Sequence, residues 1–530
     1  MNKNTYGDQS ISSLKGADRV RLRPGVIFGS DGIEGCEHSV FEILSNSIDE
    51  AKEGYGGVIR VTLHKDHSIT VEDFGRGIPL DYNKKEQRYN WDLIFCELYA
   101  GGKYNNNEGS NYEFSLGLNG LGVCATQYTS EFMNVEVRKD GYIYKLHFEG
   151  GHNIGGLNKK KAKDSMTGSK ITWRPDPKVF TDINISSEYF HNILKQQAIV
   201  NAGIRFIFTD EMENKVLDYL YPDGIEGYVK EVANGQNFSK IISIRKTTQG
   251  RDSANKPEYK LKFHIVMTFS NKVNLLEYYH NSSFLKNGGS PDRAIKNALS
   301  STIDQYVTKA NMYTKGEKRI SFSDIQDSLI LVTNSFSTLT SYENQTKKAI
   351  SNKFIQDAIQ ECLKEYLDVY FIENKDEADK ICTQILINKR SKEKAEKTRI
   401  NVRKQLNVTI DIANRIKKFV DCRSKDKNKR ELYIVEGDSA LGSCKLGRNA
   451  EFQGIMPIRG KILNCLKSDF NKIFKSEIIV DLLKVLGCGI EIEGKHNKQL
   501  NTFNLAKLRW NKVIICTDAD VDGFQSATRS

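Results

Sequence analysis

The amino-acid sequence predicts a multidomain α+β protein, and three observations support this class. The 530 residues are enough for several domains, each with its own hydrophobic core. A segment with helical periodicity at 37–53 is followed by two β-like runs within Val58–Asp73, separated by a polar turn. Near the other end, the apolar run Val513–Cys516 leads into closely spaced carboxylates. We therefore expect at least two separate regions of the chain to carry chemistry.

Composition narrows the class further. A hydrophobic fraction of 39% and an aromatic fraction of 10% are typical of a soluble globular protein. No apolar run approaches the roughly 20 residues needed to cross a bilayer, and the polar N-terminus lacks a signal-peptide core. The ten cysteines form no CxxC pair, which argues against a zinc site and favours a reducing, cytoplasmic environment. A net charge of +11 is compatible with a polyanionic partner.

The predicted helix at 37–53 has one polar side. Glu42, Asn46, Asp49 and Glu53 fall within an arc of about 60° at 100° per residue. Apolar residues gather on the opposite side. Taken alone, this pattern is typical of a surface helix.

Glycine-rich segments follow this helix. Asp73 ends the second β-like run and begins the sequence DFGRGIP, in which two glycines allow a ligand to approach the backbone. The Gly- and Asn-rich stretch 99–112 is suited to be a mobile lid, with Lys103 available for a phosphate. The run Gly117–Val123, GLNGLGV, enters a predicted helix and offers backbone N–H groups to phosphates. No GxxxxGK[ST] P-loop occurs.

In this order, and with Thr167-Gly168-Ser169 after them, these elements resemble the ATPase domain of the B-type subunits of gyrase and topoisomerase IV. These proteins belong to the type IIA topoisomerases, and their ATPase domain is a Bergerat-type (GHKL) α/β sandwich. The resemblance implies an ATPase domain with an N-terminal dimerisation arm over 1–229, an α/β transducer domain over 230–405, and a linker with a partial α/β Toprim domain over 406–530.

The resemblance also implies a role for individual residues. Glu42 would be the general base for the water that attacks the γ-phosphate, Asn46 would hold Mg²⁺, and Asp73 would accept a hydrogen bond from adenine. Arg76 and Pro79 would lie over the base. The full set implied for ATP binding is Asn46, Glu50, Asp73, Arg76, Gly77, Ile78, Pro79, Lys103, Gly117, Leu118, Asn119, Gly120, Leu121, Gly122, Val123, Ser169, Gln345 and Lys347.

Two of these residues belong to the expected transducer domain. In the sequence SYENQTKKAISN, Gln345 and Lys347 match the transducer loop that reaches the γ-phosphate, and contact that disappears on hydrolysis would act as a switch. Tyr6 and Ile11 resemble the arm that crosses to a second ATPase domain. The chain departs from the usual family pattern at Ser45, Phe74 and Asn119, positions where Asp, Asn and His are usual.

A run of alternating carboxylates lies near the C-terminal end of the sequence. If the backbone is still extended, Asp518, Asp520 and Asp522 share one face with neighbours about 7 Å apart, and repulsion costs about 2 kcal/mol per adjacent pair at an effective dielectric of ~20. A divalent cation with oxygen ligands, most simply Mg²⁺, would offset this repulsion. A solvated acidic turn is the alternative.

Together with Glu436, which ends a predicted strand, the acidic run resembles a Toprim domain. The resemblance implies that Glu436 and Asp518 hold one Mg²⁺, that Asp520 and Asp522 serve a second, and that Glu436 takes part in catalysis. Arg448, Arg459 and Lys461 resemble DNA-contacting residues. A Toprim domain continues past Gly523, so we expect the sequence to stop within this domain.

The expected function is that of an ATP-hydrolysing B-type subunit, which closes as a dimeric clamp on duplex DNA and couples hydrolysis to strand passage. No tyrosine can be assigned as DNA nucleophile, so cleavage would need an A-type partner in an A2B2 heterotetramer. Gyrase and topoisomerase IV are not separated by this reasoning. Two alternatives are an ATPase clamp without cleavage and a DNA-binding protein that no longer hydrolyses ATP.

Overall fold

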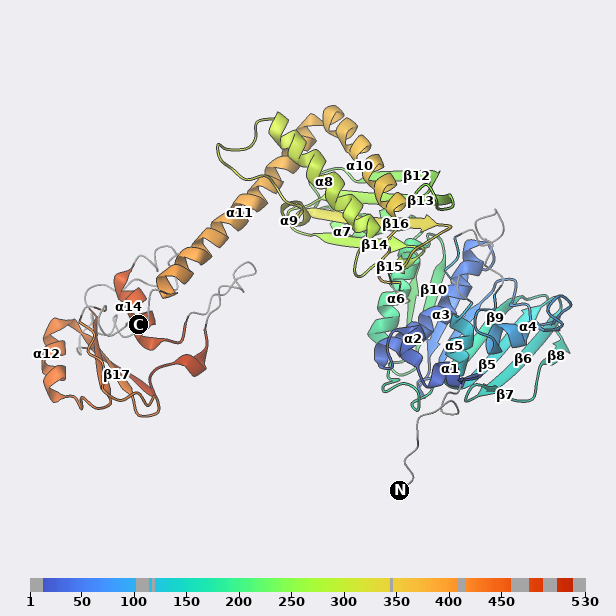
Figure 1. Cartoon of the computed structure of the whole chain (residues 1–530), viewed down its shortest axis with the longest axis horizontal. Helices are drawn as coiled ribbons and strands as arrows, with labels where there is room; N and C mark the ends of the chain where they lie inside the picture. The colour runs from blue at the N-terminus through green and yellow to red at the C-terminus, as the bar shows by residue number, and fades with distance from the viewer. Residues whose placement is uncertain are drawn as a thin grey trace, which may run out of the picture. The chain divides into compact units, whose positions relative to one another are not determined.

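The computed structural model describes residues 13–101, 114–116, 120–343, 347–407, 416, 418–458, 476–489 and 503–517, with side chains in the fourth range described to 398. Contacts between residues divide the chain into two compact units, Met1–Leu386 and Ile387–Ser530. Each unit combines sheets with helices (Figure 1). The predicted α+β multidomain class is confirmed.

The first sheet contains nine strands among the described residues, in the order β11-β10-β1-β2-β9-β5-β6-β7 with β8 beside β6. Buried and exposed residues alternate along its strands, so one face meets the core. The two predicted β-runs are β1 (Val58–Leu63) and β2 (Ile69–Asp73). The others are β5 (Ser130–Lys139), β6 (Tyr142–Glu149), β7 (His152–Asn153), β8 (Asn158–Lys161), β9 (Gly168–Pro175), β10 (Arg205–Asp210) and β11 (Lys215–Tyr219).

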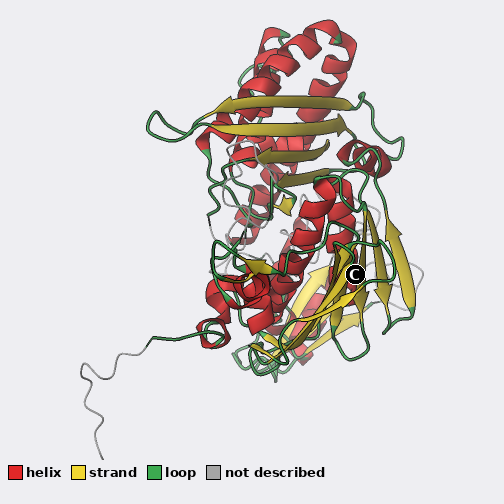
Figure 2. Ribbon diagram, turned by 90° about the vertical axis from the view of Figure 1, so that its right-hand side faces the viewer, coloured by secondary structure: helices red, strands yellow, loops and turns green. Residues whose placement is uncertain are grey.

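Helices cover the buried face of this sheet (Figure 2). They include α3 (Ile33–Lys52), α5 (Gly122–Tyr128) and α6 (Ser187–Val200). The same part of the chain also contains α1 (Asp18–Arg21), α2 (Pro24–Phe28) and α4 (Asn90–Cys96). A separate hairpin joins β3 (Tyr82–Asn83) and β4 (Arg88–Tyr89). In α3 the polar side is also buried: Glu42 and Asp49 are 7% and 2% exposed. The surface-helix interpretation is therefore wrong, because the polar side of α3 faces a cavity and a later segment of the chain.

The second sheet has the order β12-β13-β16-β14-β15. Its strands are β12 (Ile242–Gly250), β13 (Tyr259–Phe269), β14 (Leu275–His280), β15 (Ser283–Phe284) and β16 (Leu329–Ser337). One face packs on α8 (Ser290–Lys309), α9 (Phe322–Gln326) and α10 (Lys353–Glu373), and the other on α7 (Ile225–Ala233) and the end of α6. Coverage of both faces explains why eight of the nine residues of β16 are buried. Helix α11 (Lys375–Asn407) follows.

The second unit contains a parallel sheet of β17 (Glu431–Glu436), β18 (Gln453–Ile458) and β19 (Lys512–Cys516), in the order β18-β17-β19. Among the described residues of this unit, the helices after α11 include α12 (Gly437–Gly447), α14 (Glu477–Leu486) and the short 3-10 helix η4 (Leu505–Lys507). Asp438 and Ser439 are residue types common at helix N-caps, but Glu436 occupies the N-cap position and both residues lie in the first turn of α12.

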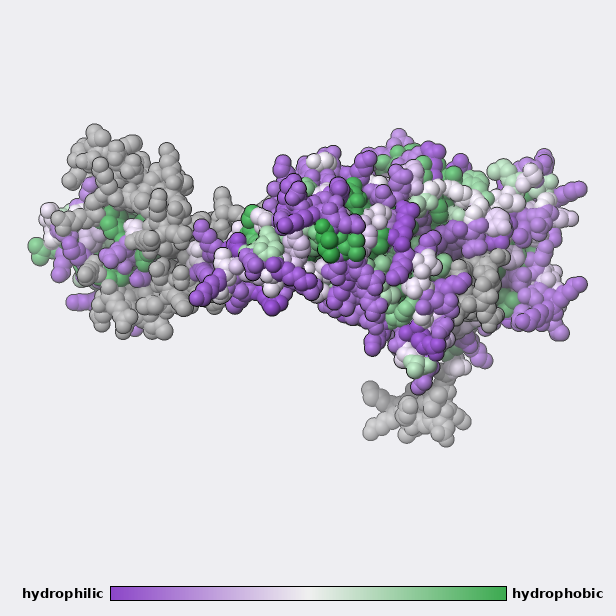
Figure 3. Space-filling view, turned by 90° about the horizontal axis from the view of Figure 1, so that it is seen from above, coloured by the Kyte–Doolittle hydropathy of each residue, from purple (hydrophilic) through white to green (hydrophobic). Residues whose placement is uncertain are grey.

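The surface in Figure 3 is mostly hydrophilic over the described residues of the first unit, with apolar residues in small separate areas. Within the described part of the chain, no helix has the length and apolar character needed to cross a bilayer.

Candidate nucleotide site

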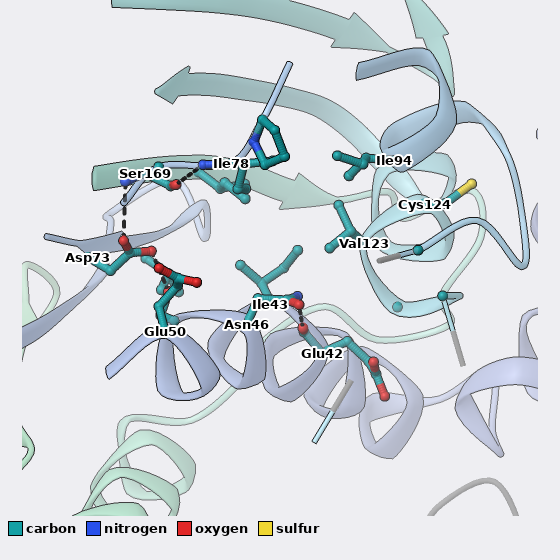
Figure 4. A pocket seen from close by; sticks show the side chains of 18 of the residues that line it. Glu42, Ile43, Asn46, Glu50, Asp73, Ile78, Ile94, Val123, Cys124 and Ser169 are labelled. Atoms are coloured by element: carbon teal, nitrogen blue, oxygen red, sulfur yellow. Dashed lines mark hydrogen bonds between the residues drawn. The ribbon is translucent and has the colours of Figure 1, made fainter. Parts of the chain in front are cut away.

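Helix α3 forms one wall of a cavity of about 400 Å³ in the first unit. Glu42, Asn46 and Glu50 follow one another at intervals of four residues, so they lie along the same side of the helix (Figure 4). Asn46 Nδ2 donates to the backbone oxygen of Glu42 at 2.9 Å, which fixes the side chain against the wall.

Every described residue to which the sequence assigns ATP contact or γ-phosphate chemistry lines this cavity. These residues are Glu42, Asn46, Glu50, Asp73, Arg76, Gly77, Ile78, Pro79, Gly120, Leu121, Gly122, Val123, Ser169 and Lys347. They come from both sheets of the first unit and from segments more than 300 residues apart, the separation of Glu42 and Lys347 being 305.

Glu42 lies between two basic side chains. His38 Nε2 is 3.2 Å from Glu42 Oε1, and Lys347 Nζ is 3.4 Å from the same oxygen. Burial raises the pKa of the Glu42 carboxyl, but the Lys347 ammonium and the hydrogen bond from His38 outweigh it and lower the pKa to about 2. Glu42 is therefore held as a carboxylate.

Lys347 reaches the cavity from the segment that follows β16. Its side chain is only 9% exposed, and Nζ also donates to the backbone oxygen of Leu116 at 3.2 Å. Leu116 N in turn donates to Asp49 on α3 at 2.8 Å. The second sheet thus contributes a buried cation to a cavity formed mainly by the first.

Gly122, the first residue of α5, is required by the position of Glu42. A Cβ on Gly122 would lie 1.9 Å from Glu42 Oε2 and 2.8 Å from Glu42 Cβ. The glycine-rich run therefore brings backbone directly against the carboxylate, as a loop that contacts phosphates must.

Asp73 occupies the other end of the cavity. It accepts hydrogen bonds from Ser47 Oγ at 2.9 Å, Gly75 N at 3.0 Å and Ser169 N at 3.3 Å. Burial raises the pKa of its carboxyl, and these donors oppose the rise. Gly77, with φ of 77°, passes so close to β5 that a Cβ would lie 2.7 Å from the Arg138 carbonyl oxygen.

Arg76 was expected over an adenine base. The structure places its guanidinium on Glu50, with Nη2 2.9 Å from Oε1 and Nε 3.2 Å from Oε2. The same group lies 4.0 Å from the centre of the Tyr55 ring. Arg76 therefore borders the cavity as half of an ion pair with a residue of α3.

Two of the residues expected to bind metal or DNA in the Toprim domain are described by the structure, Glu436 and Arg448, and both lie in the second unit. Glu436 ends β17, and β19 is parallel to it with Val435 opposite Cys516, so both strands end at the same edge. Among the described residues, no cluster of three His, Cys, Asp or Glu side chains is present. Arg448 Nη1 donates to the backbone oxygens of Asp421 at 2.9 Å and Gln453 at 2.5 Å, so this part of its guanidinium serves the fold.

The remaining expected site residues lie outside the described part of the chain. They are Tyr6, Ile11, Lys103, Gly117, Leu118, Asn119, Gln345, Arg459, Lys461, Asp518, Asp520 and Asp522.

Sequence reasoning missed His38, which contacts Glu42 but does not line the cavity, and two residues that do line it. His38 stands four residues before Glu42, and this helical spacing alone could have identified it. Ser47 and Lys139 line the cavity, and Lys139 Nζ donates to the Arg76 carbonyl at 3.3 Å. No sequence signal singles out Lys139, because its approach depends on the pairing of β5 with β9.

Family models match three parts of the chain: a histidine kinase-, DNA gyrase B- and HSP90-like ATPase over 33–178, DNA gyrase B over 224–401, and a Toprim domain over 431–529. The B-type subunit of DNA gyrase from Thermotoga maritima is 33% identical over 527 residues, which cover 99% of this chain and 80% of the relative. The corresponding protein of Clostridium acetobutylicum is 34% identical over 531 residues, covering 99% and 79%.

Solved structures give the same picture for the first unit. The 43K ATPase domain of Thermus thermophilus gyrase B, in complex with an aminocoumarin, is 26% identical with a TM-score of 0.54, covering 73% of this chain and 98% of that one. The topoisomerase IV ATP-binding domain of Francisella tularensis is 26% identical with a TM-score of 0.55, covering 71% and 98%. The chain belongs to the DNA gyrase B family, the ATPase subunits of type IIA DNA topoisomerases.

Proposed function

We propose that this protein hydrolyses ATP in the cavity beside α3, closes as a dimeric clamp on duplex DNA, and couples hydrolysis to double-strand passage. One observation supports the proposal above all others. The fourteen described residues assigned to ATP contact or its chemistry line a single cavity, and Lys347 reaches it from the second sheet. A cavity of about 400 Å³ with one polar end at Asp73 and a charged end at Glu42 fits a nucleotide.

Glu42 and Lys347 together supply the chemistry at the phosphate end. A carboxylate with a pKa near 2 is a weak base, because Lys347 stabilises its charge. The γ-phosphate of ATP would compete with Glu42 for the Lys347 ammonium. When Lys347 pairs with phosphate, the pKa of Glu42 rises and the carboxylate accepts a proton from the attacking water more readily. His38 would keep the carboxylate oriented.

Mg²⁺ fits the donor set at both ends of the chain. In the cavity, Asn46 and the carboxylates of α3 provide the oxygen atoms that this ion prefers. In the second unit, Glu436 stands at the sheet edge where β19 also ends, directly before the segment with Asp518, Asp520 and Asp522. A bound Mg²⁺ would neutralise phosphate charge during hydrolysis and during DNA cleavage.

The proposed assembly contains DNA and a second polypeptide. An A-type subunit would supply the tyrosine that attacks DNA, in an A2B2 heterotetramer, and Arg448, Arg459 and Lys461 would contact the duplex. ATP binding would bring two ATPase domains together through the arm that contains Tyr6 and Ile11.

The test compares wild type with Glu42→Ala. The variant should bind a non-hydrolysable ATP analogue but release no phosphate, because it lacks the base while the Asp73 end is intact. Wild type without phosphate release above the variant would refute the hydrolytic function. Supercoiled plasmid with an added A-type partner then tests cleavage: Mg²⁺-dependent breaks support the full assembly, and their absence leaves an ATPase clamp.

A further inference from the structure

Two segments leave the second sheet at the same edge. Strand β14 ends at His280 and β16 ends at Ser337, and they are parallel, with His280 opposite Ser335. The chain after β16 leads to Lys347, and the chain after β14 turns toward α6. His280 lies between these two exits, and it is fully buried.

The hydrogen bonds of His280 fix its tautomer. Ser335 Oγ donates to the backbone oxygen of Tyr279 at 3.1 Å, so this hydroxyl accepts from His280 Nδ1 at 2.8 Å. Burial lowers the pKa of His280 to about 3, so the ring is neutral and Nε2 accepts. Two hydroxyls lie near Nε2, Ser337 Oγ at 3.1 Å and Thr340 Oγ1 at 2.9 Å. Ser337 donates its proton to the Leu339 oxygen at 3.0 Å, so Thr340 is the donor to Nε2, and it accepts in turn from Asn281 Nδ2 at 3.2 Å.

Thr340 lies at the start of the segment that carries Lys347. The two arms of this segment are joined by hydrogen bonds from Glu343 N to the Ala349 oxygen at 3.0 Å and from Ser351 N to the Ser341 oxygen at 2.9 Å. The arms therefore move together. On the opposite arm, Asn352 accepts from Ser341 N at 2.7 Å. His280, through Thr340, and Asn352 therefore hold the two ends of the segment that carries Lys347.

The turn after β14 connects the start of this segment to the first sheet. Asn281 and Ser282 both have positive φ, 44° and 59°, a conformation that costs energy in residues with a Cβ. Gln197 Nε2 donates to the Ser282 oxygen at 2.9 Å, and Ser282 Oγ donates to Asn201 Oδ1 at 2.8 Å. Gln197 lies in α6, which packs on β10. Asn201 is the residue directly after the end of α6.

We propose that His280 is a positioning residue for Lys347, and that its Nε2–Thr340 hydrogen bond couples the position of Lys347 to the end of α6. The inference rests on the proposed contact of Lys347 with the γ-phosphate. None of the hydrogen-bonded partners of His280 lines the nucleotide cavity, so their effect on ATP must pass through Lys347.

Two substitutions of His280 separate its two nitrogens. In His280→Asn the amide occupies the position of Nδ1 and can still donate to Ser335, but the side chain at position 280 no longer reaches Thr340, which keeps only its contacts with Asn281 and Ser337. In His280→Gln the amide oxygen reaches the position of Nε2 and can accept from Thr340. Thr340→Val and Thr340→Ser form a matched pair that removes or retains the hydroxyl at similar size.

The measured quantities are the affinities for ADP and for a non-hydrolysable ATP analogue, the kcat of ATP hydrolysis, and the melting midpoint. His280→Asn and Thr340→Val should lower both kcat and the preference for the analogue over ADP by about tenfold, equivalent to about 1.4 kcal/mol. The affinity for ADP should stay at the wild-type value. His280→Gln and Thr340→Ser should restore most of the preference.

Lys347→Gln separates a failure of the proposed Lys347–phosphate contact from a failure of the proposed role of His280. If it leaves the analogue-over-ADP preference intact, the proposed contact of Lys347 with the γ-phosphate is wrong. If Lys347→Gln abolishes the preference but His280→Asn and Thr340→Val only lower the melting midpoint, then His280 is merely structural and the inference is overturned. Equal loss in His280→Gln and His280→Asn would also overturn it.

Discussion

Replacement of Lys347 by methionine should destabilise the first unit in a pH-dependent way. The substitution keeps the length of the side chain and removes only the ammonium group, which lies 3.4 Å from Glu42 Oε1. Both side chains are 9% exposed, so solvent screens the pair little. Without Lys347, the carboxylate stays buried and His38 is its remaining basic neighbour.

The magnitude follows from the pKa of Glu42. A fall from the ordinary value of 4.5 to about 2 corresponds to about 3 kcal/mol, at about 1.4 kcal/mol per pKa unit. Loss of one partner of a buried ion pair costs about 3–5 kcal/mol, which agrees. Because the folded pKa is depressed, this stabilisation is present above pH 4.5 and disappears as the pH falls toward 2. In Lys347→Met the pKa of Glu42 rises. Acidification then protonates the buried carboxylate, which removes its unpaired charge and part of the destabilisation.

The assay is the melting midpoint of wild type and Lys347→Met at pH 8 and at pH 5. The difference between the two proteins should be large at pH 8 and smaller at pH 5. Lys348→Met is the matched control: its ammonium lies 3.8 Å from Glu34, whose side chain is 68% exposed, and such pairs contribute about 0–1 kcal/mol. An equal difference at both pH values, or an equal loss in the control, would refute the reasoning.

Three further substitutions test other contacts. Gly122→Ala should abolish phosphate release because its Cβ would lie 1.9 Å from Glu42 Oε2, whereas Gly57→Ala, with open space around it, should leave release unchanged. Asp73→Asn should weaken ADP and an ATP analogue equally, by about tenfold or more, because the amide presents a donor where adenine needs an acceptor; calorimetry that shows selective loss of the analogue would contradict this. Trp510→Phe should destabilise the second unit by about 1–3 kcal/mol, seen as earlier melting of that unit alone. The reason is that the buried Val485 carbonyl, which accepts from the indole N–H at 2.7 Å, loses its donor.

Local patterns predicted two strands of the first sheet and many of the residues that line the cavity. The four-residue spacing of Glu42, Asn46 and Glu50 requires only that the segment be helical, and α3 is helical throughout. Asp73 was recognisable because a β-like run ends in a carboxylate followed by glycines. The GLNGLGV run was recognisable because glycines directly before a predicted helix leave backbone N–H groups open to phosphates.

Contacts between distant segments were not predictable from such patterns. The position of His280 gave no signal, because a single histidine among apolar residues at a strand end is typical of a buried core residue. Its role depends on the parallel pairing of β14 with β16, which places two chain exits side by side. The use of Arg448 for two backbone carbonyls likewise depends on how its segment folds back toward Gln453. A basic residue in a recognised motif predicts charge, and the fold decides where that charge is used.

The pairing of Glu42 with Lys347 explains why hydrolysis would need both sheets. Glu42 lies on α3 beside the first sheet, and burial alone would favour its protonated form. The compensating cation comes from the second sheet, through a segment anchored at Thr340 and Asn352. Any anion that draws Lys347 away therefore changes two properties together: the basicity of Glu42 and the contact between the sheets. A phosphate at that position would increase the basicity of Glu42 and would replace the direct Glu42–Lys347 contact with one through the nucleotide, so that the charge of the nucleotide would coordinate chemistry with the contact between the sheets.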